Sequence, residues 1–356
     1  MITPGKSITL KLIAEKANCS IAQVSSVLNK SKGGTVVSAA RREKIQKIAD
    51  ALGYVPNFAS QTLKKKHTKI IGIYNEPGPW RSMGNTYELT VFRGIERAAV
   101  KNGYDLLILN LSVSLNAKVC AEKLEGAQCD GLVLFRIPPY ASWVEQLLAR
   151  GKKLFAVECG TKIPGLSRTK FDEDAAMRLA FSKLLELGHR RIGFLGLGIY
   201  SKEPDRCRIF RECMSEFRCD KDDSLIFDHT NTPIYIDASM EYSKLSGIYG
   251  MRYMKSLANP PTALIAHDSF IAVSALQEAQ KLGISIPENM SLVGIDNYDF
   301  ISIFSPRLAA INHHLIEMGE FAVQHLIDQI EGKTATPIIQ TFSPGWIDGE
   351  SCRKIE

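Results

Sequence analysis

The sequence predicts a multi-domain chain, with a small all-α helix-turn-helix head and a larger α/β body of two lobes built on parallel sheets. Three observations predict this fold class. The 356 residues exceed what one ordinary core needs. Short segments of helical period, flanked by capping residues, fill the first 53 residues. From residue 68 onward, apolar strand-like runs alternate with segments of helical period.

In the head, the first two predicted helices are joined by a tight turn. Residues 9–17 carry apolar side chains at the 3.6-residue period, and Thr9 is placed to cap them. Ser20 and Gln23 stand three residues apart, as in a capping box that opens a second helix. Two short helices in this arrangement indicate a helix-turn-helix, although any small helical bundle would show the same periodicity.

Two further helical segments complete the head. Ser38 and Gly53 are placed to cap and to end a third helix. Residues 57–63 follow Pro56 and are expected to form about two helical turns, with three lysines directly after them. Because so short a helix is unstable alone in water, we expect it to fold on a partner. The three lysines that follow it favour DNA as that partner.

Charge is concentrated in the head. Residues 1–69 hold 13 Lys and Arg against three Asp and Glu, a net charge of +10, whereas the other 287 residues have a net charge of −4. A basic head on a mildly acidic body is typical of proteins that bind a phosphate backbone. A solvated basic tail would carry the same charge, but the helical pattern argues against one.

The body alternates strands and helices. Continuous apolar runs of this kind indicate parallel sheets covered on both faces, and there are too many for one sheet. The predicted strands are 70–74, 106–111, 131–135, 154–157, 192–197, 262–266 and 291–295.

Polar residues follow the predicted strands. Asn75, Arg136, Glu158, Asp268 and Asp296 each stand at a strand end, where open parallel sheets bind ligands. Any one of them is more often a solvated loop residue, but their recurrence favours a cleft for a polyhydroxylated or other small polar ligand.

Composition and cysteine spacing exclude several classes of protein. Hydrophobic residues make up 45% of the chain, no apolar stretch reaches ~20 residues, and the N-terminus lacks a secretory signal. We therefore expect a cytoplasmic protein with no membrane partner. The eight cysteines form no C-x-x-C, which favours free thiols over disulfides or a metal site.

Several segments closely resemble the LacI/GalR repressor family. In the head they are T-L-K-L-I-A-E-K-A-N-C-S-I-A-Q-V-S-S-V-L-N at 9–29, V-S-A-A-R-R-E-K-I at 37–45 and L-G-Y-V-P-N-F-A-S-Q-T-L at 52–63. In the body they are L-G-H-R-R-I-G-F-L-G at 187–196, A-H-D-S-F-I-A-V-S-A-L at 266–276 and I-P-E-N-M-S-L-V-G-I-D-N at 286–297. The resemblance covers nearly the whole chain. It implies a two-lobed, periplasmic-binding-protein-like (type I) effector domain.

The resemblance also implies which head residues meet DNA. Ile21, Ala22 and Ser26 would face major-groove bases, and Leu63 would wedge into a minor-groove base step. Ser26 departs from the arginine of many relatives and cannot read guanine through two hydrogen bonds. The residues expected to bind DNA are Thr9, Ser20, Ile21, Ala22, Gln23, Ser25, Ser26, Asn29, Tyr54, Asn57, Ala59, Ser60 and Leu63.

In the body, the resemblance makes Arg206 the effector-clamping arginine. His313 stands where relatives often have Gln, and His267 replaces a usual Asn, which departs from standard sugar recognition. Trp80 would either stack on a sugar ring or cover the cleft mouth. The residues expected to bind the effector are Asn75, Trp80, Arg136, Glu158, Arg206, Asp268, Asp296 and His313.

The implied function is transcriptional repression controlled by a small molecule, most simply a sugar or sugar derivative, with a homodimer on a palindromic double-stranded operator. We expect no cofactor, no metal and no catalytic residues, so not an enzyme. Two alternatives remain: a cytosolic solute-binding protein, and a nucleotide-dependent enzyme suggested by the glycines of 193–198. Against the enzyme, a dinucleotide fingerprint requires a helix that begins within the glycine run, whereas residues 199–204 separate these glycines from the next helix.

The expected domain boundaries follow from these patterns. A helix-turn-helix domain takes residues 1–56, a hinge helix and linker take 57–67, and an effector-binding and dimerisation domain takes 68–356. Its first lobe is expected at about 68–165 and 314–334, and its second at about 166–313 and 335–356.

Overall fold

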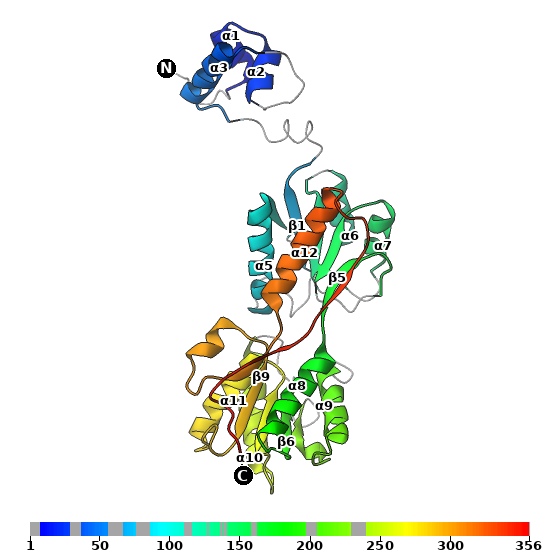
Figure 1. Ribbon diagram of the computed structural model, residues 1–356, viewed down its shortest axis with the longest axis vertical. Helices are drawn as coiled ribbons and strands as arrows, with labels where there is room; N and C mark the ends of the chain where they lie inside the picture. Colours follow the sequence, from blue (N-terminus) through cyan, green and yellow to red (C-terminus); the bar gives the residue numbers. More distant parts are fainter. Residues whose placement is uncertain are drawn as a thin grey trace. The chain divides into compact units, whose positions relative to one another are not determined.

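The computed structural model describes residues 8–28, 37–55, 67–75, 86–109, 116–126, 128–135, 137, 141–157, 162–196, 205–228 and 240–355. The chain divides into two compact units, residues 1–68 and residues 69–356 (Figure 1). We refer to them as the head and the body.

The head packs three helices, α1 (Leu10–Ala17), α2 (Ile21–Leu28) and α3 (Ala39–Leu52), around one small core. Ile13, Val24 and Ile45 contribute one fully buried side chain from each helix. These are the positions that the helical period marks as inward, so the hydrophobic pattern predicts which face of each helix is buried.

Local capping sets the helix ends of the head. The Gln23 backbone N–H donates to Ser20 Oγ at 3.2 Å, and the Ser20 N–H donates to Gln23 Oε1 at 3.3 Å, which confirms the predicted capping box. Gly53 ends α3 with φ +66°, a left-handed conformation that glycine adopts without strain. Ser38 stands at the start of α3, but its side chain makes no capping hydrogen bond, so that part of the expectation is wrong.

The first sheet of the body is parallel throughout, in the order β11-β5-β4-β3-β1-β2. Helices α5 and α12 pack so closely that a Cβ on Gly94 would lie 1.9 Å from the Ile316 carbonyl oxygen. The strands are β1 (Ile70–Asn75), β2 (Asp105–Leu109), β3 (Gly131–Phe135), β4 (Leu154–Val157), β5 (Ser167–Phe171) and β11 (Ile339–Phe342). The helices are α5 (Thr86–Asn102), α6 (Asn116–Glu125), α7 (Ser142–Ala149) and α12 (Leu315–Ile330).

The second sheet has the order β12-β10-β9-β8-β6-β7, and only β12 runs antiparallel to its neighbour. Its strands are β6 (Ile192–Leu195), β7 (Ile226–Phe227), β8 (Ala263–Ala266), β9 (Ser291–Ile295), β10 (Ala309–Asn312) and β12 (Gly345–Ile347). Its helices are α8 (Glu173–Glu186), α9 (Asp205–Glu216), α10 (Met240–Ser256) and α11 (Ser269–Lys281), with 3-10 turns at Asp223–Leu225 and Asp299–Ile303.

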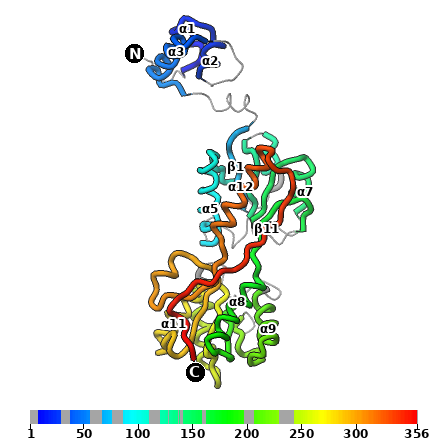
Figure 2. Tube along the Cα trace, in the orientation of Figure 1, coloured from blue at the N-terminus to red at the C-terminus, as the bar shows by residue number. Residues whose placement is uncertain are grey.

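The chain passes between the two sheets three times. It crosses after β5, again between β10 and α12, and finally between β11 and β12, where the red end of the trace runs from the first sheet to the second (Figure 2). The expected lobe boundaries at 166 and 335 are therefore wrong for β5 and β11. Both strands pair within the first sheet, β5 with β4 and β11 with β5, so the lobes change only after Phe171 and Phe342.

All seven predicted strands are present, and the sequence missed the short strands β5, β7, β10, β11 and β12. The seven cysteines in the described part of the chain are free thiols, as expected. No helix among the described residues is long and apolar enough to cross a membrane.

Candidate functional site

The start of α2 presents an apolar surface on the head. Ile21 is 48% exposed and Ala22 beside it is also exposed, while the capping box fixes the backbone of this turn. The described lysines and arginines of the head are all exposed as well. They are Lys11, Lys16, Arg41, Arg42, Lys44 and Lys47. An ordered helix start with exposed apolar side chains, on a basic unit, suits insertion into a groove of DNA.

Other residues predicted to bind DNA have different surroundings. Ser26 is only 9% exposed and packs inward, so it presents little surface for a base and the expected contact is not supported. The side chains of Thr9, Ser20 and Gln23 cap helices, and Tyr54 packs against the head core. Asn29, Asn57, Ala59, Ser60 and Leu63 lie outside the described residues.

In the body, Arg206 of α9 is the centre of a polar cluster. Its Nε and Nη2 donate to the two carboxylate oxygens of Glu173 at 2.6 and 2.9 Å, and its Nη1 donates to the His267 carbonyl oxygen. Its Nη2 lies 4.0 Å from Asp296 Oδ1. Arg206 is 8% exposed, so this cluster holds the guanidinium in one orientation.

Asp296 follows β9 with φ +77°, a strained conformation of the kind that is frequent at functional sites. His313 Nδ1 lies 2.7 Å from its Oδ1, and the Tyr298 hydroxyl donates to its Oδ2 at 3.3 Å. Burial alone would raise the pKa of Asp296, but the hydrogen bond and charge of His313, with the charge of Arg206, lower it to about 2. The His313 ring stacks on Phe171, with centroids 3.7 Å apart.

His267 and Asp268 follow β8, and burial favours the uncharged form of both side chains. Burial and the charge of Arg206 lower the pKa of His267 to about 3, so its imidazole is neutral. Burial raises the pKa of Asp268 to about 6, although its Oδ1 accepts from the Ile271 N–H and its Oδ2 accepts from Ser243. The pKa of Asp296 is lowered and that of Asp268 is raised within one cluster. Side chains with strongly shifted pKa values mark a candidate binding site.

Among the described residues, three buried polar atoms at strand ends have no hydrogen-bond partner: Nδ2 and Oδ1 of Asn75, and Nδ1 of His267. Leaving such an atom unpaired costs about 1–3 kcal/mol, which a bound ligand would recover. Asn75 ends β1 in the first lobe, whereas His267, Asp268 and Asp296 belong to the second. Trp80, Arg136 and Glu158 lie outside the described residues.

Sequence patterns missed three residues of this cluster: Glu173, Phe171 and Tyr298. Glu173 is the first residue of α8, where an acidic residue is commonplace, and its contact with Arg206 spans 33 positions. Phe171 belongs to a strand that was not predicted. Only Tyr298 carried a signal, since it follows β9 by three residues.

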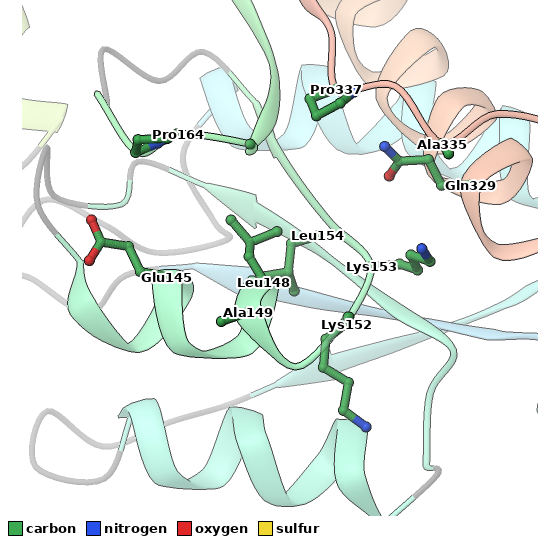
Figure 3. A pocket seen from close by; sticks show the side chains of 12 residues that line it. Glu145, Leu148, Ala149, Lys152, Lys153, Leu154, Pro164, Gln329, Ala335 and Pro337 are labelled. Atoms are coloured by element: carbon green, nitrogen blue, oxygen red, sulfur yellow. The ribbon is translucent and has the colours of Figure 1, made fainter.

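A separate cavity of about 670 Å³ lies in the first lobe, between α7 and the segment that leads into β11 (Figure 3). Leu148, Leu154, Pro164 and Pro337 give it apolar walls, and Lys152 and Lys153 stand at its edge. None of the described lining residues has a buried polar atom without a partner. The second-lobe cluster therefore remains the better candidate site.

Family models match both units. Residues 9–57 match the lacI family of bacterial regulatory proteins, and residues 181–352 match the periplasmic binding protein-like domain. Among curated proteins, the chain is 28% identical to the HTH-type transcriptional repressor CytR of Escherichia coli K12, over 91% of this chain and 90% of the relative. It is 25% identical to the repressor PurR of Aliivibrio salmonicida, over 98% of this chain and 99% of the relative.

A solved structure shows the same fold. The lac repressor dimer bound to operator and the anti-inducer ONPF aligns with a TM-score of 0.78, covering 98% of this chain and 100% of that one at 19% identity. These relatives are regulators and not enzymes, which agrees with the expectation from the sequence. The chain thus combines a LacI-family helix-turn-helix head with a periplasmic-binding-protein-like body, and it has the fold of the lac repressor.

Proposed function

We propose that the chain is a sequence-specific transcriptional repressor whose affinity for operator DNA is set by a small molecule bound in the body. The observation that carries this proposal is the reciprocally capped start of α2, which holds Ile21 and Ala22 exposed on a basic head. An exposed isoleucine there suits contact with thymine methyl groups.

The partners and location that we propose follow the family. A homodimer in the cytoplasm binds a palindromic operator with two heads, residues 1–56 acting as the DNA-binding domain and 57–67 as the hinge. The effector is a sugar or sugar derivative, held by the Arg206 cluster and by Asn75, together with Trp80, Arg136 and Glu158. Relatives described with bound ribose, glucose and cellobiose support this ligand class.

The test begins with selection of a binding duplex from a random pool by the full chain, followed by fluorescence anisotropy across a salt series. We expect log affinity to fall linearly with log salt, with a slope that reports several phosphate contacts. Ile21→Asp should reduce specific affinity for DNA by at least about a hundredfold, because the new carboxylate would lose its water and face the bases on binding. Leu12→Asp, on the exposed side of α1, is the matched control and should retain most of the affinity. Equal losses in both variants would contradict the proposed role of α2.

A further inference from the structure

The Glu173 carboxylate already occupies the fork of Arg206. Both of its oxygens accept from the guanidinium, at 2.6 and 2.9 Å, in the planar two-bond geometry with which arginine otherwise binds the phosphate or carboxylate of a ligand. The side chains of Glu173 and Arg206 are 30% and 9% exposed, so the pair is held largely out of water. Glu173 thus takes up hydrogen-bond donors that an anionic group of a ligand would otherwise use.

The described cluster around this pair carries an excess of negative charge. Among the described residues, the cluster holds the three carboxylates of Glu173, Asp268 and Asp296 and one arginine, Arg206. If His313 is protonated against Asp296, one negative charge still remains in excess.

We infer that Glu173 determines ligand specificity: by neutralising Arg206, it makes the cleft accept uncharged or cationic ligands and reject phosphate esters and carboxylates. This inference rests on the proposed function, because it concerns the ligand of the same site. It narrows the effector to an unphosphorylated sugar, nucleoside or similar compound. A partly buried site with excess negative charge repels an anion strongly, since water screens the repulsion poorly there.

The test uses the full chain and isothermal titration calorimetry. The probes are inorganic phosphate and three pairs, each a neutral compound and its phosphate ester: ribose and ribose 5-phosphate, glucose and glucose 6-phosphate, cytidine and cytidine 5′-monophosphate. The wild-type chain should bind no phosphorylated probe more tightly than its neutral parent. Inorganic phosphate should bind it no more tightly than it binds an Arg206→Ala variant.

Glu173→Gln supplies the decisive comparison. A phosphate on Arg206 would lie roughly 6 Å from the Glu173 carboxylate, so removal of that charge should raise phosphate affinity about a hundredfold at an effective dielectric constant of about 20. Glu212→Gln removes the same charge from an exposed pair with Arg208 on α9 and should leave phosphate affinity unchanged. Glu173→Asp keeps the charge and should retain the rejection of phosphate.

Two results would overturn the inference. One is a wild-type chain that binds a phosphate ester more tightly than the neutral parent, with affinity that depends on Arg206. The other is a folded Glu173→Gln variant that binds phosphate no better than Glu212→Gln. Neither result bears on DNA binding, which the duplex selection tests separately, so failure of the specificity role and failure of the proposed function are distinguishable.

Discussion

Replacing His267 with asparagine should remove a specific part of the pH dependence of stability. In the folded chain the pKa of His267 is lowered from its ordinary 6.5 to about 3, first by burial and then by the charge of Arg206. Between these two values the unfolded chain takes up a proton that the folded chain does not. Stability is therefore lost as pH falls below 6.5, and the loss continues down to about pH 3.

The size of the effect follows from the two pKa values. At pH 7.5 the histidine is neutral in both states and contributes almost nothing. At pH 5 the unfolded form is largely protonated while the folded form is neutral, which costs about 2 kcal/mol of unfolding free energy. Asp268 acts in the opposite direction, because its raised pKa of about 6 favours the folded state as pH falls below 6. That contribution is present in both proteins, so it largely cancels in the difference.

The assay is urea unfolding followed by tryptophan fluorescence at pH 7.5 and pH 5. The three tryptophans, Trp80, Trp143 and Trp346, all belong to the body, so the signal reports the unit that holds His267. Between the two pH values, His267→Asn should lose about 2 kcal/mol less stability than the wild type. His67→Asn makes the same change at an exposed residue and should behave as wild type. Equal losses in the wild type and His267→Asn would show that His267 is not the group that takes up this proton on unfolding.

Three further predictions test packing, capping and the hinge. Gly94→Ala should cost at least about 2 kcal/mol in the same urea assay, since its Cβ would lie 1.9 Å from the Ile316 carbonyl oxygen, whereas Val100→Ala on the exposed side of α5 should cost under about 0.5 kcal/mol. Ser20→Ala should destabilise α2 by about 1 kcal/mol, seen as roughly fivefold faster amide hydrogen exchange in that helix. Leu63→Ala should weaken specific DNA binding by anisotropy while leaving effector affinity nearly unchanged.

Each of these predictions has a result that contradicts it. A Gly94→Ala chain as stable as wild type would mean that α5 and α12 can separate without cost. If amide hydrogen exchange in α2 is unchanged after Ser20→Ala, the capping box does not stabilise this helix. Operator affinity unaffected by Leu63→Ala would exclude the wedge role that the family resemblance implies for this residue.

Much of the fold could be predicted because local rules decide it. The Ser20 and Gln23 caps depend on residues three positions apart, and strands such as β3 are continuous apolar runs. The lobe boundaries could not be placed, because the membership of β5 and β11 in the first sheet depends on pairing between segments about 170 positions apart. Short strands with polar residues carry little periodic signal of their own.

The candidate site could be predicted only in part, for the same reason. Asp268 and Asp296 were found because parallel strands end at one edge of a sheet. Glu173 was not found, since nothing near it in the sequence shows that its partner is Arg206. The family motif places Ser26 at a DNA-facing position, but in the structure Ser26 is only 9% exposed, and that burial depends on how the three helices of the head pack.

The most direct test of a regulated DNA-binding function is the affinity of the full chain for its selected duplex, with and without compounds that bind the body. We predict at least one compound that changes this affinity by tenfold or more, about 1.4 kcal/mol of coupling. DNA must then change the affinity for that compound by the same factor. Arg206→Ala should retain DNA binding and lose the response. Two results would contradict control of DNA binding through this cleft. One is a response that persists in Arg206→Ala, and the other is an affinity for the compound that is the same with and without saturating DNA.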